Sequence, residues 1–171
     1  MKRIYLVLSF LVGFFLLSSI SNALNAQACG QGVWMIGGQI GFNSVSSDGN
    51  SFSLFSFQPE AGYFVIDNLA IGTSLGLTAV EGSTEFGIGP FVRYYLWSNL
   101  FAQAGVKYLT GPINPFDIFD SISPFRYGAG VGYSFFVNSA VAIEPGLQVD
   151  FGDDIIYFGI GIGIQAFLGR E

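Results

Sequence analysis

Most of the chain alternates apolar and polar positions with a period of two, in segments separated by turn residues. Alternation of this kind is typical of β-strands, in which successive side chains point to opposite faces of a sheet. Eight such segments follow one another along the sequence. They span residues 32–43, 51–65, 69–80, 84–96, 100–110, 123–136, 140–151 and 155–168.

The two faces of the predicted strands differ in chemistry. One face carries bulky apolar side chains and no charge, as in Ile156, Phe158, Ile160 and Ile162 of the last segment. The other face carries glycine, serine, glutamine and every charged residue of the strands. These charged residues are Glu60, Glu85, Arg93, Lys107, Arg126, Glu144 and Asp150.

Two architectures produce strands of this kind, and they orient the two faces oppositely. A soluble barrel or sandwich buries its apolar face and exposes a polar face rich in lysine and glutamate. A barrel in a membrane turns its apolar face to lipid. Because the polar face here is crowded with small residues that suit a narrow interior, the pattern predicts an all-β fold: an eight-stranded antiparallel up-and-down transmembrane β-barrel. A soluble ligand-binding barrel is the alternative.

The first 28 residues predict a secretory signal peptide. Lys2 and Arg3 precede an apolar stretch at 4–17, and Ala26-Gln27-Ala28 forms a small-residue cleavage site. The apolar stretch is short for an uncleaved membrane anchor, which is the alternative interpretation. We therefore expect a signal peptide at 1–28 and a mature barrel domain at 29–171.

Composition agrees with an exported membrane protein. Hydrophobic residues make up 51% of the chain, charged residues only 11%, and the mean hydropathy is +0.54. All 12 acidic residues but only four of the six basic residues follow residue 28. An acidic mature chain lacks the basic surface that nucleic acid requires, so we expect no nucleic-acid partner.

Cys29 would be the first residue of the mature chain and is the only cysteine. Its position makes lipidation possible, although the residues before it lack the large aliphatic side chain usual three positions upstream. The alternative is an unmodified thiol at a frayed end. With one cysteine, the chain forms no intrachain disulfide.

The sequence indicates no enzyme, cofactor or metal site. It contains no histidine, which removes the common catalytic triads and histidine-ligated zinc. Carboxylates such as Glu144 and Asp150 could act as acid and base. Facing arginine and lysine inside a closed barrel, they are expected instead to form a structural ion-pair network with Glu60, Glu85, Arg93, Lys107 and Arg126.

Glycines on the same face are expected to make room for that network. Gly159, Gly161 and Gly163 alternate along the last strand, and we expect them to clear space for the long basic side chains. If all the charges pair, the lumen is blocked to solutes. If they separate, a narrow path for ions opens.

Turn lengths predict the orientation, because barrels of this kind have short periplasmic turns and longer outer loops. The short turns at 65–69, 96–100 and 136–140 are flanked by aromatic residues that we expect to form a periplasmic girdle: Tyr63, Phe64, Tyr94, Tyr95, Trp97 and Phe135. The other ends carry acidic residues that could attract divalent cations bridging lipopolysaccharide, or a basic partner. They are Asp48, Glu81, Asp117, Asp120, Asp153 and Asp154.

Several segments resemble a known family. They include "EAGYFVIDNLAIGTSLGL", "FGIGPFVRYYL" and "YGAGVGYSFFVNSAVAIEPGLQVDF", which are similar to the OmpA/OmpX-like outer-membrane β-barrel domain in its Bacteroidota form. The resemblance covers about residues 33–168. It implies a small barrel in the outer membrane of a Gram-negative bacterium, in contact with outer-membrane lipid, lipopolysaccharide and the barrel-assembly machinery, and without a shared catalytic site.

Two functions therefore stand at this point. The first is a structural and surface-interaction role, with a lumen filled by side chains and a possible ligand at the outer loops. The alternative is a narrow porin-like channel for ions or small solutes.

Overall fold

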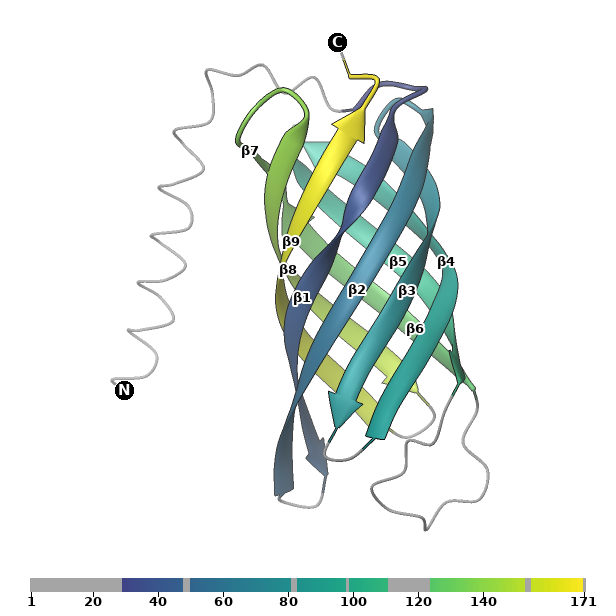
Figure 1. The fold of residues 1–171 in the computed structure, drawn as a ribbon, viewed down its shortest axis with the longest axis vertical. Helices are drawn as coiled ribbons and strands as arrows, with labels where there is room; N and C mark the ends of the chain where they lie inside the picture. Colours follow the sequence, from purple (N-terminus) through teal and green to yellow (C-terminus); the bar gives the residue numbers. More distant parts are fainter. Residues whose placement is uncertain are drawn as a thin grey trace, which may run out of the picture.

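The protein is a closed antiparallel β-barrel with eight strand positions, seen here in a computed structural model (Figure 1). The structure describes residues 29–47, 50–80, 83–97, 99–110, 124–152 and 155–170. Within these residues no helix is both long and apolar enough to cross a membrane.

The strands agree with the predicted segments to within a few residues. They are β1 (Trp34–Ser47), β2 (Asn50–Ile66), β3 (Leu69–Val80), β4 (Ser83–Trp97), β5 (Leu100–Thr110), β6 (Phe125–Tyr133), β7 (Phe135–Phe136), β8 (Val141–Gly152) and β9 (Ile155–Leu168). The short β7 continues β6 after an interruption at Ser134, and both pair with β8, so the two together occupy one of the eight strand positions. Neighbours in sequence pair with each other, and β1 pairs with β9 to close the ring.

The apolar face points outward, as the alternation predicts. Along β9, Ile160, Ile162 and Ile164 remain 63%, 56% and 61% exposed, whereas the neighbouring Gln165 is 1% exposed. A soluble protein would bury such a face against other elements. Here it surrounds the barrel and is matched to a hydrocarbon environment.

The short turns gather at the end of the barrel where β1 begins and β9 ends, which we call the terminal end (Figure 1). In the β2–β3 turn Asn68 adopts a positive φ of 67°, a conformation that asparagine tolerates well. In the turn before β8, the Asn138 side chain accepts hydrogen bonds from the backbone of Ala140 and Val141, both at 2.8 Å. The opposite end is called the loop end.

The expected aromatic girdle is wrong for two of its six members. Tyr63, Tyr94 and Trp97 face outward near the terminal end, but Phe64 and Tyr95 are buried inside the barrel. The reason is the period of two, because the neighbour of an outward residue points into the lumen.

The inward aromatic residues belong to an apolar core inside the terminal end. This core also contains Cys29, which is 1% exposed, so the expectation of a frayed end is wrong. The backbone of Asn68 donates to the Cys29 carbonyl at 3.1 Å, which holds the segment across the barrel end. The full set is Cys29, Val33, Met35, Phe64, Ala70, Phe91, Tyr95, Phe101, Ala142 and Phe167.

Candidate functional site

The lumen holds all of the charged residues of the strands, and the structure divides them into two groups. The inner cluster, next to the apolar core, consists of Arg93, Glu60 and Glu144. The outer group lies toward the loop end and consists of Glu85, Lys107, Arg126 and Asp150.

In the inner cluster one guanidinium bridges two carboxylates from strands on other sides of the barrel. Arg93 Nη2 lies 2.5 Å from Glu60 Oε1, and Nη1 lies 2.8 Å from Glu144 Oε2. The three side chains are only 4%, 2% and 3% exposed. Ions so far from water are costly unless every polar atom finds a partner.

Neutral donors complete the coordination of both carboxylates. Gln103 Nε2 donates to Glu60 Oε2 at 3.1 Å, and Gln165 Nε2 donates to Glu60 Oε1. Ser134 Oγ donates to Glu144 Oε1 at 2.5 Å. All four carboxylate oxygens therefore accept at least one hydrogen bond, which offsets the desolvation of two negative charges around one positive charge.

Arg93 also connects the inner cluster to the apolar core. Its guanidinium carbon lies 4.1 Å from the centre of the Phe101 ring, a cation–π geometry. Its Nη1 lies 3.1 Å from Met35 Sδ, and its Nε donates to Gln103 Oε1 at 2.6 Å. The inner cluster and the apolar core are thus in direct contact inside the terminal half of the barrel.

The outer group is less completely paired. Arg126 Nη2 lies 3.2 Å from Glu85 Oε1, and its guanidinium stacks 4.5 Å from the Tyr157 ring centre. Lys107 Nζ donates to Gln58 Oε1 at 2.8 Å. The Arg126 side chain keeps 18% exposure, so solvent reaches this group from the loop end.

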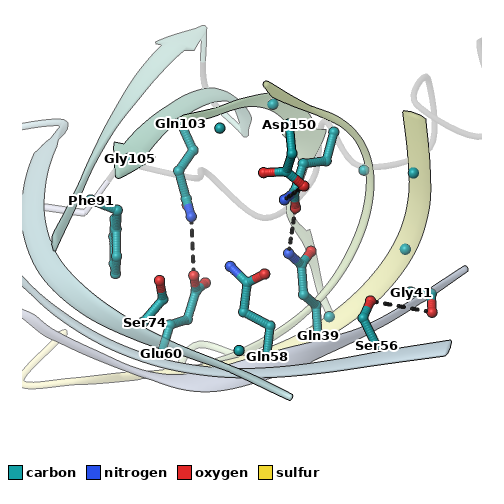
Figure 2. Close-up of a pocket in the computed structure, with 18 of the residues that line it drawn as sticks. Gln39, Gly41, Ser56, Gln58, Glu60, Ser74, Phe91, Gln103, Gly105 and Asp150 are labelled. Atoms are coloured by element: carbon teal, nitrogen blue, oxygen red, sulfur yellow. Dashed lines mark hydrogen bonds between the residues drawn. The ribbon is translucent and has the colours of Figure 1, made fainter. Parts of the chain in front are cut away.

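A cavity of about 100 Å³ runs along the lumen, and side chains of both the outer group and the inner cluster line it. Figure 2 shows Gln39, Gln58, Gln103 and Asp150 directed toward it from different sides. Gln39 Nε2 donates to Gln148 Oε1 at 3.1 Å across one side. The described residues contain no cluster of three histidine, cysteine or acidic side chains arranged to hold a metal ion.

Gly161 and Gly163 of β9 are not nearest to the basic side chains, contrary to the expectation from sequence, while for Gly159 that expectation stays a prediction. A Cβ on Gly161 would lie nearest Ile40 O, and one on Gly163 nearest Gly38 O, at 3.0 and 3.3 Å. Lys107 is a basic side chain that does lie beside glycines, since it passes Gly76 on β3 and Gly87 on β4. Parity alone places glycines in the lumen but does not say which long side chain crosses them.

Sequence reasoning missed the neutral part of the site. The inner cluster is completed by Gln103, Gln165, Ser134 and Tyr95. These side chains are uncharged, so the search for charged residues did not include them. The signal that could have found three of them is parity, since both glutamines and Ser134 fall on the same face as the charged residues. The acidic residues predicted for the outer loops, at 48, 81, 117, 120, 153 and 154, lie outside the described residues.

No family model and no curated protein matches the sequence. Solved structures do match its fold. Neisserial surface protein A has a TM-score of 0.58 at 17% identity, with 80% of this chain and 99% of that chain covered. The N-terminal β-barrel domain of OprF from Pseudomonas aeruginosa has a TM-score of 0.55 at 17% identity, with 81% of this chain and 99% of that chain covered.

A third neighbour is the attachment invasion locus protein Ail of Yersinia pestis, in complex with the heparin analogue sucrose octasulfate. Its TM-score is 0.52 at 14% identity, with 81% of this chain and 99% of that chain covered. At these identities the likeness concerns the fold alone. The chain thus has the fold of the small eight-stranded outer-membrane β-barrels.

Proposed function

We propose that this chain is a small outer-membrane β-barrel protein of a Gram-negative bacterium, exported by a signal peptide at 1–28, with a structural and surface-interaction role. The observation that carries the proposal is the sorting of the two faces. The outward face holds exposed rings and branched aliphatic side chains, whereas Glu60, Arg93 and Glu144 are buried in the lumen. A bilayer stabilises this arrangement because a closed barrel leaves no unpaired sheet edge in lipid.

The proposal includes a lumen closed by side chains. The inner cluster and the apolar core occupy the terminal half, and the Arg93 ion pairs span it from β4 to β2 and to β8. Moving an ion through this layer requires breaking buried, fully bonded charges, which costs several kcal/mol or more. We therefore expect a role of scaffold and contact and not of conduction.

Contacts would be made with outer-membrane lipid and lipopolysaccharide around the barrel, with the barrel-assembly machinery during insertion, and with a surface ligand at the outer loops. The neighbour Ail was solved with a polyanionic heparin analogue. In this chain the loop positions 48, 81, 117, 120, 153 and 154 are acidic, so the same electrostatics favour a divalent cation or a basic partner instead.

The alternative function is a narrow channel for ions or small solutes, favoured by the cavity of about 100 Å³ that both the inner cluster and the outer group line. Conductance of the refolded chain in a planar lipid bilayer distinguishes the two. We expect no steady conductance from the native chain and openings from Arg93→Ala, which removes both inner ion pairs. The matched variant Arg126→Ala, in the outer group, stays closed. Steady conductance of the native chain would overturn the closed lumen.

A further inference from the structure

Two opposite charges in the outer half of the lumen face one cavity without pairing with each other. Lys107 on β5 and Asp150 on β8 both line the cavity of about 100 Å³. Neither forms an ion pair within 4.0 Å among the described residues, whereas Arg126 and Glu85 beside them pair with each other. Leaving such charges separate in a low-dielectric lumen is costly unless something between them completes their bonds.

One carboxylate oxygen of Asp150 lacks a hydrogen bond among the described residues. The residue is 8% exposed, and its Oδ2 accepts a hydrogen bond from Gln148 Nε2 at 2.6 Å. Its buried Oδ1 has no hydrogen-bond partner in the part of the chain that the structure describes. In Figure 2 the Asp150 carboxylate is directed toward the cavity. An occupant at this position would have to be a donor.

The Lys107 ammonium group has more hydrogen-bond donors than the one bond to Gln58 uses. Its side chain runs from β5 past Gly87 and Gly76, whose Cβ positions would lie 3.8 and 3.9 Å from it. At its tip Nζ donates to Gln58 Oε1 at 2.8 Å. An ammonium group carries three donors, so an occupant at this position would have to be an acceptor.

The cavity that both residues line is large enough for a small solute. About 100 Å³ is several times the ~10–15 Å³ that one water molecule requires, so the cavity accommodates several waters or one small solute. The side-chain amides of Gln39, Gln58 and Gln103 line it together with Asp150 (Figure 2). It is reached from the loop end, where Arg126 keeps 18% exposure.

We propose that this cavity is a binding site for a small zwitterion, such as a short amino acid, which exchanges with water. The cationic N–H end donates to Asp150 Oδ1, and the anionic end accepts from the Lys107 ammonium. The inner cluster takes no part, because each of its carboxylate oxygens already accepts a hydrogen bond. The site is a blind one, in which the solute is held and not passed on.

The test is a titration of the refolded full-length mature chain, labelled with ¹⁵N, in detergent micelles. Glycine is the probe, and the readout is the NMR shift of the side-chain amides of Gln39, Gln58 and Gln148. Trimethylglycine is the matched control ligand, because it has the same charges but no N–H donor and a larger cationic end. We expect a saturable shift with glycine and none with trimethylglycine.

Variants locate the site. Asp150→Asn and Lys107→Met should each weaken glycine binding about tenfold or more, since each removes a charge-assisted hydrogen bond. Asp67→Asn makes the same charge change at an exposed turn of the terminal end and should leave binding unchanged. Asp150→Asn is nearly isosteric, so the test stands even if Lys107→Met folds poorly.

Shifts that rise linearly without saturation, or equal affinity in Asp150→Asn and the native chain, would show that water alone fills the cavity and would overturn the proposal. The outcome is independent of the closed lumen, which is tested by conductance. If the native chain both binds glycine and conducts ions, only the proposed closed lumen is contradicted. If it neither conducts ions nor binds glycine, only this inference is contradicted.

Discussion

Arg93 is the residue on which the interior of the terminal half depends. One guanidinium bonds two carboxylates, a glutamine and a thioether, and stacks on Phe101. Removing a partner from a buried ion pair costs more than the pair itself contributes, because the remaining charge stays desolvated. Two carboxylates would be left in that state here.

Arg93→Met should therefore lower the free energy of unfolding by about 3–5 kcal/mol. Arg126→Met is the matched control, because its ion pair with Glu85 is longer, at 3.2 Å, and its side chain is 18% exposed. Solvent screening limits that loss to about 1 kcal/mol. Urea unfolding of both variants in lipid vesicles, followed by tryptophan fluorescence, measures the difference. Equal losses would show that the inner cluster is not the main electrostatic support of the fold.

Cys29 illustrates what burial does to a reactive group. Desolvation inside the apolar core raises the pKa of its thiol to about 12, so the reactive thiolate is scarce at ordinary pH. We expect no labelling of the folded mature chain by maleimide between pH 7 and 9, and rapid labelling in urea. Burial also argues against a lipid on this sulfur, and we expect intact-mass measurement of the mature chain to find none. Labelling of the folded chain at pH 8 would contradict this account.

At the scale of the strands, prolines interrupt the ladders beside the inner cluster. Pro59, Pro90 and Pro145 face outward, and the pairing of their strands skips or ends next to each of them. Proline cannot donate a ladder hydrogen bond. Two of the three adjoin the inner carboxylates, since Pro59 precedes Glu60 and Pro145 follows Glu144. The irregular backbone is thus located where the lumen is best bonded from inside.

Glycines in the strands differ in how much room they leave. A Cβ on Gly89 would lie 1.8 Å from Val106 O, whereas one on Gly76 would meet nothing closer than 3.9 Å. Gly89→Ala should therefore lower the free energy of unfolding by about 1–3 kcal/mol through overpacking, and Gly76→Ala should change it little. Urea midpoints of the two refolded variants measure this. A stable Gly89→Ala barrel would mean that β4 and β5 separate more easily than their pairing indicates.

The strands could be predicted from sequence because their signal is local. The alternation of side chains identified every strand position and its outward face. The resemblance to a small outer-membrane barrel agrees with the observed fold. Partners across the lumen could not be predicted in this way. Which glutamine meets Glu60, or which glycine Lys107 crosses, depends on barrel closure and strand stagger. The girdle prediction misplaced Phe64 and Tyr95 because it relied on closeness to the turns, whereas the alternation itself places both side chains in the lumen.

At the scale of the molecule, the barrel has two unlike halves. The terminal half contains the apolar core and the inner cluster, and the outer half contains the outer group, with a cavity that both groups of charges line. Around both halves runs a continuous apolar surface. Such a surface is what the proposed position in a bilayer requires.

The two tryptophans provide the most direct test of the central claim, that this outward surface lies in lipid. Trp34 and Trp97, the only two in the chain, are 53% and 75% exposed at the terminal end. Their fluorescence should be quenched strongly by lipids brominated near the headgroup and weakly by lipids brominated at the end of the acyl chain, since interfacial tryptophans lie at headgroup depth. Absence of quenching by any brominated lipid, after refolding with vesicles, would contradict a transmembrane barrel.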